Sequence, residues 1–363
     1  SLDEFLEFFA TGPKEGGTQM SSKNENCDID INDIISNALS TNKQVIFTGA
    51  PGTGKTYAVR NYVKKQCKEH GYDESHYKFV QFHPSYDYTD FVEGLRPVQL
   101  NENGAPTFVR LDGIFKAFCR QIAERNQKSD KNAAEETYYF IIDEINRADL
   151  AKVFGELMFG LEEGYRGEKF DTQYQNLPTY QVDPDTKQVT QLKAENDVFK
   201  DGFYIPENLY IIGTMNDIDR SVDSIDFALR RRFAWVEIKA NDIMETSLKS
   251  MLENKLGKEK TEDLAERITD MNEVISGKKD EIGKRFYLTE AYHIGPAYFK
   301  NVVNAETPEE VLEILKGIFD GNITSILKEY TRGRDAESVE EFIKACRNEL
   351  LRETGESDDA GEQ

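Results

Sequence analysis

The chain has 363 residues, of which 38% are hydrophobic and 31% are charged, a composition typical of globular proteins rather than disordered ones. Its formal net charge is -22, from 45 basic and 67 acidic residues, which argues against broad, non-specific binding of duplex DNA. No apolar run reaches the length of about eighteen residues that a membrane span needs, and four widely spaced cysteines indicate reduced thiols in a cytoplasmic protein.

Residues 1–30 are expected to form an N-terminal segment that ends in a linker, because residues 10–28 are rich in Gly, Ser, Asn and Lys. Residue 1 is Ser rather than Met, so we also expect that sequence upstream of it is missing.

From residue 31 onward, short apolar runs alternate with segments that have the apolar spacing of helices. The expected strands span residues 44–49, 77–82, 137–143, 209–214 and 233–238. The expected helices span residues 31–40, 57–67, 113–127 and 150–163. Strands that are apolar nearly throughout and alternate with helices predict an α/β fold with a parallel five-stranded sheet between helices. In such a sheet the ligand lies beyond the carboxyl ends of the strands.

Two regions depart from this alternation. Residues 166–208 interrupt it between the third and fourth strands, and Thr- and Val-rich runs around the turn sequence DPDT predict a β-hairpin there. From residue 240 helical patterns continue to residue 352, followed by an acidic tail, residues 353–363, that we expect to be disordered. The sequence therefore predicts an α/β domain over residues 31–239, with the hairpin as an insertion, and an all-helical lid domain over residues 240–352.

The sequence GAPGTGKT, residues 49–56, follows the first expected strand and matches the phosphate-loop pattern G-x-x-x-x-G-K-[ST]. In such a loop the backbone N–H groups and the following helix N-terminus bind phosphate oxygens. Lys55 would reach the β- and γ-phosphates, and Thr56 would ligate Mg²⁺. A chance match in a chain of this length has a frequency of only about one in a hundred. The expected nucleotide contacts are Gly49, Ala50, Pro51, Gly52, Thr53, Gly54, Lys55, Thr56 and Tyr57.

The third expected strand ends in the sequence DEINRAD, residues 143–149. Asp143 would hold Mg²⁺ through a water molecule, and Glu144 would act as the general base on the attacking water. Taken alone, a solvated strand end explains two adjacent carboxylates equally well. Together with a phosphate loop, they favour a nucleoside triphosphatase over a module that uses nucleotide only as an assembly switch.

The fourth expected strand runs into a cluster of polar residues, IIGTMNDIDRS, at residues 211–221. Because we expect this strand between the first and third strands, Asn216 at its end would project toward the γ-phosphate and orient the water without carrying charge. Asp219 and Arg220 follow, where a neighbouring subunit or a partner protein could dock. The alternative for Asp219 and Arg220 is a local salt bridge that only shapes the loop.

Three consecutive arginines, Arg230, Arg231 and Arg232, lie at the end of an expected helix, just before the fifth strand. They point in different directions around the helix end, so we expect at least one to face outward and reach a nucleotide bound by the next subunit. Such an arginine finger can raise turnover by about 10³ to 10⁵. The alternative is favourable placement of cations at a helix C-terminus, which explains one arginine better than three.

These elements, in this order, resemble the AAA+ superfamily and, more closely, the McrB family, the GTP-hydrolysing motor subunit of McrBC restriction systems that attack methylated DNA. The family signature M-N-T-A-D-R-S is similar to MNDIDRS at residues 215–221, which differs at Asp217 and Ile218. A weaker match is IGPAYF, where Pro296 and Ala297 depart from the family pattern I-G-H-S-Y-F. The likeness covers about residues 30–335, and its other similar stretches are FHPSYDYTDFVEGLRP, DEINRAD, NLYIIGTMN and ALRRRF.

The resemblance implies an Mg²⁺-dependent nucleoside triphosphatase, for which GTP is favoured and ATP is the alternative. Asn216 would be the sensor that positions the water, and Arg231 and Arg232 would act across subunits of a ring, expected to be a hexamer. A McrC-like partner would stimulate hydrolysis and carry the nuclease, and DNA would be reached through the assembled complex or a missing N-terminal domain. The competing hypothesis is an ATP-driven protein-remodelling factor of the MoxR or dynein-related kind.

Overall fold

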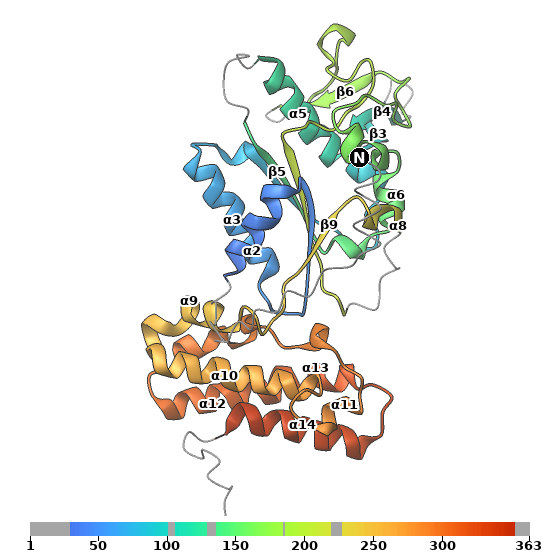
Figure 1. Ribbon diagram of the computed structural model, residues 1–363. Helices are drawn as coiled ribbons and strands as arrows, with labels where there is room; N and C mark the ends of the chain where they lie inside the picture. Colours follow the sequence, from blue (N-terminus) through green and yellow to red (C-terminus); the bar gives the residue numbers. More distant parts are fainter. Residues whose placement is uncertain (1–29, 101–105, 129–135, 184–185, 219–226, 353–363) are drawn as a thin grey trace, which may run out of the picture.

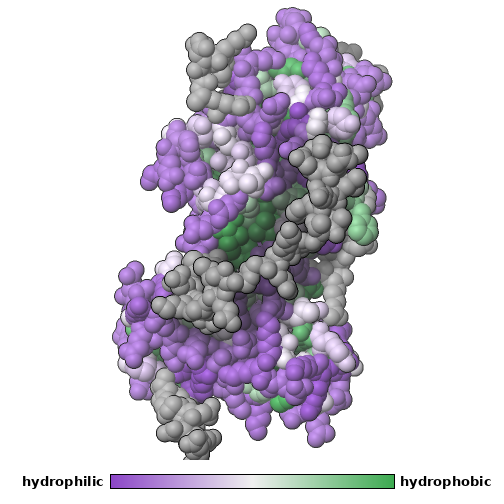
Figure 2. All heavy atoms as spheres, in the orientation of Figure 1, coloured by the Kyte–Doolittle hydropathy of each residue, from purple (hydrophilic) through white to green (hydrophobic). Residues whose placement is uncertain are grey.

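The computed structural model describes residues 30–100, 106–128, 136–183, 186–218 and 227–352. An α/β part is followed along the chain by a helical part, which Figure 1 shows below the sheet. Figure 2 shows hydrophilic residues over most of one face, with hydrophobic residues mainly near the middle, where the two parts meet. The predicted linker before residue 30, the acidic tail, Asp219 and Arg220 lie outside the described residues.

Five parallel strands form the central sheet, in the order β2-β5-β8-β1-β9. Their bounds are β1 Gln44–Thr48, β2 Tyr77–Gln81, β5 Tyr138–Asp143, β8 Leu209–Thr214 and β9 Ala234–Glu237. All five expected strands are confirmed, and β8 lies between β1 and β5 as predicted. Ile142 pairs with Gly213, and Phe47 pairs with Thr214, so the carboxyl ends of the three middle strands meet at one edge.

The side chains of the central strands alternate between two hydrophobic cores, because successive residues of a strand point to opposite faces. Ile46 and Phe140 belong to one core, and Phe47 and Ile141 belong to the other. Burial on both faces is the reason that each strand is a nearly continuous apolar run. The covering helices are α5 Ile114–Lys128, α6 Leu150–Phe154 and α7 Leu157–Gly160 on the first face, and α2 Ile31–Thr41 and α3 Lys55–Glu69 on the second. Figure 1 shows α5 and α6 on one side of the sheet and α2 and α3 on the other.

The single helix predicted over residues 150–163 is wrong, because the chain forms two short helices, α6 and α7, separated around Gly155. Gly155 has a φ of 49° and a ψ of -128°, which is not a helical conformation but one that glycine tolerates. A Cβ at Gly155 would lie 3.1 Å from the ring of Tyr88 on α4, Tyr88–Phe91. The chain therefore bends where α4 packs against it.

A second, smaller sheet lies beside α5 and has the strand order β3-β4-β6-β7. Its antiparallel pair β6 Thr179–Val182 and β7 Val189–Gln191 is the predicted hairpin of the insertion. The sequence did not reveal the other pair, β3 Glu93–Leu100 and β4 Pro106–Asp112. Gly94 and Pro97 weaken the strand pattern of β3, and the pairing shifts its register between Pro97 and Gln99.

Buried charged residues fasten this small sheet to α5. Lys116 Nζ lies 2.6 Å from Glu93 Oε2, and both side chains are fully buried. Arg120 Nε donates to Asp112 Oδ2 at 2.6 Å, and its Nη1 donates to Asp197 in the insertion. Removing one partner of such a buried pair typically costs about 3–5 kcal/mol, because the other charge stays buried.

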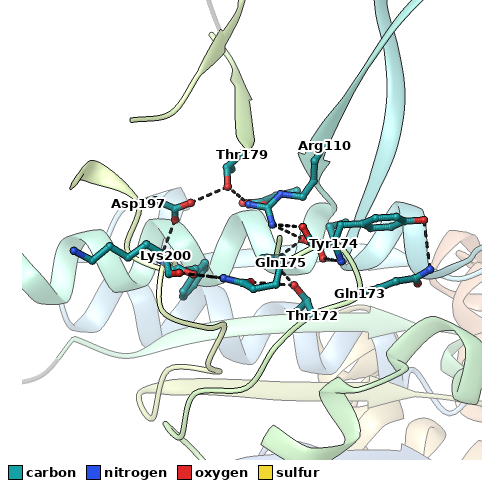
Figure 3. Close-up of polar contacts among 12 residues, drawn as sticks. Arg110, Thr172, Gln173, Tyr174, Gln175, Thr179, Asp197 and Lys200 are labelled. Atoms are coloured by element: carbon teal, nitrogen blue, oxygen red, sulfur yellow. Dashed lines mark hydrogen bonds and ion pairs between the residues drawn. The ribbon is translucent and has the colours of Figure 1, made fainter. Parts of the chain in front are cut away.

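Figure 3 shows how the insertion joins this network. Thr179 accepts a hydrogen bond from Arg110 and donates to Asp197 Oδ2 at 2.7 Å. Arg110 Nη1 also donates to the carbonyl oxygen of Tyr174 at 2.7 Å. The backbone N–H of Tyr174 donates to Glu93 Oε1 at 2.9 Å. The insertion is thus fixed to the core of the α/β part through buried polar contacts.

The helical part has its own hydrophobic core and begins after β9. A π-helical turn, Phe319–Ile323, joins α12 to α13, so the helical pattern predicted beyond residue 240 continues here through a local change of winding. Among the described residues, no helix has both the length and the apolar character to cross a membrane. The helices are α9 Met244–Leu256, α10 Lys258–Ile275, α11 Glu281–Lys284, α12 Pro308–Ile318, α13 Thr324–Tyr330 and α14 Ala336–Leu351, with 3₁₀ segments at Glu290–Tyr292 and Pro296–Asn304.

Candidate active site

The phosphate loop follows β1 and adopts a backbone shape that requires glycine. Gly49 has a φ of 143° and Gly52 a φ of 77°, values that residues with a side chain rarely adopt. A Cβ on Gly49 would lie 2.2 Å from the carbonyl oxygen of Ile238. The predicted loop, residues 49–56, therefore runs directly against the end of β9 before it leads into α3.

The side chain of Lys55 lies within this loop and is 5% exposed. Its Nζ donates to the carbonyl oxygens of Gly49 at 2.9 Å and Ala50 at 2.8 Å, and to Asn216 Oδ1 at 3.1 Å. Burial lowers the pKa of Lys55 to about 8, and nearby carboxylates oppose this shift. A phosphate group beside the ammonium group would favour its charged form, as expected for a lysine that binds nucleotide phosphates.

Hydroxyl and carboxylate oxygens gather next to Lys55. Thr56 Oγ1 donates to Asp143 Oδ1 at 2.6 Å, and Thr214 Oγ1 donates to the same oxygen at 2.7 Å. Mg²⁺ prefers hard oxygen ligands and usually takes one or two carboxylates, while water and phosphate oxygens complete its shell. The described part of the chain holds no group of three or more His, Cys, Asp or Glu residues that could enclose a metal ion. This donor set therefore fits Mg²⁺ bound together with a nucleotide.

Glu144 and Asn216 lie side by side at the same edge of the sheet. Asn216 Nδ2 donates to Glu144 Oε1 at 3.3 Å, while the amide oxygen accepts from Lys55. Arg147 Nε donates to the other carboxylate oxygen, Glu144 Oε2, at 3.2 Å. Glu144 has a φ of 51° and a ψ of 44°, a left-handed conformation that costs about 1–2 kcal/mol and is typical of functional sites. A chain of hydrogen bonds thus connects the phosphate loop with the carboxylate predicted to be the general base.

The structure adds Thr214 and Arg147 to the residues predicted from the sequence. Thr214 precedes Asn216 by two residues, so the alternation of a strand could have placed it on the same face. Arg147 follows Glu144 by one 3₁₀ turn, Ile145–Arg147. Tyr57 stays a prediction, because its side chain extends from the first turn of α3 and the residue is 75% exposed.

The three arginines lie at the opposite edge of the sheet. Arg230 ends α8, Phe227–Arg230, and the other two arginines follow it. Gln44 Nε2 at the start of β1 donates to the carbonyl oxygen of Arg232 at 2.7 Å. Since the strands are parallel, about 15 Å of strand separates the arginines from the phosphate loop of the same protomer. The guanidinium of Arg230 lies over the ring of Trp235, 5.3 Å from its centroid.

Arg231 and Arg232 share one partner, Glu162, but differ in what else holds them. The side chain of Arg232 is 11% exposed, and its Nη2 lies 2.8 Å from Glu162 Oε2. Arg232 also donates to the carbonyl oxygens of Met158 at 2.7 Å and Ala228 at 2.6 Å. The side chain of Arg231 is 64% exposed, and its Nη2 lies 3.4 Å from the same Glu162 oxygen. Arg231 therefore has the greater freedom to reach another subunit.

Comparison with known proteins identifies the fold family. The family model described as AAA domain (dynein-related subfamily) matches residues 44–233, more than half of the chain. The chain belongs to the dynein-related AAA family. Its sheet order, phosphate loop and helical C-terminal part are those expected for an AAA fold, and the chain is a P-loop NTPase.

Two curated relatives of this AAA chain are restriction-system components. It is 36% identical over 298 residues to the Type IV methyl-directed restriction enzyme EcoKMcrB subunit of Escherichia coli (strain K12), a match that covers 82% of this chain and 56% of that protein. It is 28% identical over 238 residues to the Type II restriction enzyme BsuMI component YdiS of Bacillus subtilis (strain 168), covering 58% of this chain and 63% of that protein. The chain thus spans less than two thirds of either relative, and the predicted resemblance to the McrB family is confirmed.

Among solved structures, the chain aligns with a provisionally named ATPase from Cytophaga hutchinsonii ATCC 33406. The alignment covers 86% of this chain and 78% of the chain of that ATPase. The identity is 13% and the TM-score is 0.29, too low to support any conclusion about function.

The helical part of this AAA chain contacts the phosphate loop directly. The backbone N–H of Gly295 donates to the carbonyl oxygen of Pro51 at 3.1 Å, and that of Ala297 donates to Gly52 at 2.9 Å. A Cβ on Gly52 would lie 2.5 Å from the ring of Tyr298. The stretch IGPAYF, where the sequence departs from the McrB pattern, therefore lies beside the predicted nucleotide site.

Proposed function

We propose that this chain is the Mg²⁺-dependent, ring-forming motor subunit of a McrBC-like restriction endonuclease for modified DNA, with GTP as the favoured substrate and ATP as the alternative. The observation that carries the proposal is the hydrogen-bonded series Lys55–Asn216–Glu144, with Thr56 and Asp143 beside it. This series joins phosphate binding to a candidate base at the carboxyl edge of the sheet, where ligands of such sheets bind.

Each residue of the series has a role in hydrolysis that follows from its position. Lys55 and the loop N–H groups bind the phosphates and hold the γ-phosphoryl group in place. Thr56 and Asp143 would hold Mg²⁺, and a bound Mg²⁺ would supply positive charge next to the transferred phosphoryl group. Asn216 orients the attacking water, and Glu144 accepts its proton as the oxygen approaches phosphorus.

The separation of the arginines from the phosphate loop supports the proposed ring. Arg231 and Arg232 lie about 15 Å from the loop of their own protomer, so they act on the site of a neighbour. A contact between two different faces, repeated head to tail, closes into a ring when the rotation between neighbours closes, and we propose that it does so here. We take this ring to be a hexamer on the resemblance to the McrB family.

The free thiols of Cys67, Cys119 and Cys346 support a cytoplasmic location.

The relatives support a nuclease partner, because both are named as parts of restriction enzymes. We infer that a McrC-like subunit binds the ring, stimulates hydrolysis and carries the nuclease. Residues 166–208 contain five basic and eight acidic residues, which argues against DNA binding by the insertion alone. DNA contact is therefore assigned to the assembled complex or to an N-terminal domain outside this sequence.

The first test is phosphate release by the purified chain with GTP and, separately, with ATP at matched Mg²⁺. GTP preference supports the restriction motor. ATP preference without any response to a nuclease subunit would move the function to protein remodelling, a possibility that the dynein-related family match keeps open. Glu144→Gln should bind nucleotide but lose turnover, and unchanged turnover in this variant would show that Glu144 is not the base.

A further inference from the structure

Glu162 lies at the sheet edge that carries the arginines, and neither the sequence motifs nor the comparisons give it a role. Its Oε2 lies 2.8 Å from Arg232 Nη2 and 3.4 Å from Arg231 Nη2, and its side chain is 40% exposed. One carboxylate oxygen thus holds both arginines. All three residues line a surface hollow of about 670 Å³, where a neighbouring protomer could enter.

The backbone around Glu162 is fixed relative to the arginines. Gln44 Nε2 donates to the carbonyl oxygens of Leu161 at 2.6 Å and Arg232 at 2.7 Å. Arg166 Nη1 donates to Gln44 Oε1 at 2.6 Å, which holds the amide of Gln44 in this orientation. The segment that carries Glu162 and the segment that carries the arginines are therefore both tied to the first residue of β1.

Arg231 depends on Glu162 more than Arg232 does. Arg232 has two backbone carbonyl partners besides Glu162, and its side chain is nearly buried. The side chain of Arg231 is 64% exposed, and among the described residues its ion-pair partner is Glu162. A long arginine side chain that nothing restrains samples many rotamers, whereas a carboxylate partner limits them.

We propose that Glu162 is a positioning residue for the arginines that act on the neighbouring protomer's nucleotide. The proposal rests on the proposed function, because it needs a ring in which Arg231 or Arg232 reaches the next site. In this proposal Glu162 acts through the arginines and not directly on the nucleotide or the attacking water. It holds the guanidinium groups near the interface, so that little rearrangement is needed when the next phosphate loop approaches. The exposed ion pair with Arg231 contributes little to folding stability, and Glu162→Gln leaves an amide oxygen that can accept from the nearly buried Arg232, so the effect of this change falls mainly on turnover.

The direct test is Glu162→Gln, with Glu163→Gln as its matched control. Both variants remove one negative charge, from adjacent positions. Glu162 forms ion pairs with Arg231 and Arg232, whereas Glu163 forms none with the described residues, so the comparison isolates the contact with the arginines. We expect Glu162→Gln to lower kcat by about tenfold to a hundredfold, the effect of a small misplacement of a catalytic group. KM, nucleotide affinity and Tm should match those of the unaltered chain, and Glu163→Gln should match it in kcat as well.

Mixed rings then show in which protomer Glu162 acts. Glu144→Gln removes the base from a protomer but leaves its arginines intact, whereas Glu162→Gln does the reverse. In an equal mixture, about one quarter of the head-to-tail interfaces combine an intact base with correctly held arginines, so turnover should rise well above that of either variant alone. A mixture of Arg231→Ala and Glu144→Gln, assayed in parallel, tests whether the arginine itself acts across the interface.

The outcomes separate the two levels of the argument. Two results would overturn the role of Glu162 alone. One is an unchanged kcat in Glu162→Gln. The other is a loss of kcat that is not relieved by mixing with Glu144→Gln, although the mixture of Arg231→Ala with Glu144→Gln recovers turnover. If the mixture of Arg231→Ala with Glu144→Gln also fails to recover turnover, Arg231 does not act across subunits. Glu162 then has no role in positioning that arginine for catalysis. An unaltered chain that hydrolyses neither GTP nor ATP refutes the proposed function itself.

Discussion

Arg231 and Arg232 are adjacent in sequence, yet their alanine variants should separate folding stability from turnover. Arg232→Ala removes three hydrogen bonds, to Glu162 and to the carbonyl oxygens of Met158 and Ala228. Hydrogen bonds to charged groups contribute about 1.5–3 kcal/mol each, and water replaces part of this at a site that is 11% exposed. We therefore expect a net loss of about 2–4 kcal/mol in the free energy of unfolding. At about 2–4 °C per kcal/mol, Tm should fall by roughly 5–15 °C.

Arg231→Ala removes one ion pair from a side chain that is 64% exposed, so the free energy of unfolding should change by only about 0–1 kcal/mol. Its turnover should fall by about 10³ if it is the arginine that reaches the next nucleotide. Thermal unfolding in the absence of nucleotide measures the effect on stability. Phosphate release by assembled rings measures the effect on turnover. Equal Tm values for the two variants would refute the anchoring of Arg232. Full turnover in Arg231→Ala would exclude it as the finger and leave Arg230 or Arg232.

Three further predictions follow from other contacts. Thr214→Val keeps the side-chain shape but removes the hydrogen bond to Asp143, so half-maximal turnover should need about tenfold more Mg²⁺, as measured by metal titration; an unchanged requirement would show that Thr214 does not orient the ligand. Burial lowers the pKa of His293 to about 4, so the unfolded state binds more protons than the folded state between about pH 4 and 6.5, and stability falls as pH falls through this window. In His293→Gln, the loss of stability over this window, measured by chemical denaturation, should be smaller by about 2–3 kcal/mol. Identical pH profiles of the two proteins would contradict the burial of a neutral ring. Gly52→Ala should weaken nucleotide binding without preventing folding, because its Cβ would collide with Tyr298 where the lid meets the loop; fluorescent-nucleotide titration that gave wild-type affinity would show that this contact is dispensable.

The fold could be predicted where local sequence and tertiary position impose the same pattern. The strands around Phe47 and Phe140 are buried on both faces, so nothing polar interrupts them and their length is evident. The helical pattern over residues 150–163 gave a wrong prediction because apolar spacing says nothing about the backbone at Gly155, where the chain bends beside α4. The hairpin β3–β4 stayed hidden because its stability depends on buried partners such as Lys116, which lies outside the hairpin on α5.

The candidate site shows the same division between local and distant determinants. Lys55, Asp143, Glu144 and Asn216 lie at or beyond the carboxyl ends of β1, β5 and β8, so one rule about the carboxyl edge of a parallel sheet brings them together. Glu162 has no such rule, because it lies 70 residues from Arg232 in sequence and meets it only where the segment around α7 contacts the turn between α8 and β9. Under the proposed function, a chain with its base at one edge of the sheet and its arginines at the other needs separate groups to hold each in position. We propose that Asn216 holds the base, that Glu162 holds the arginines, and that the contact between two protomers brings the two halves of the site together.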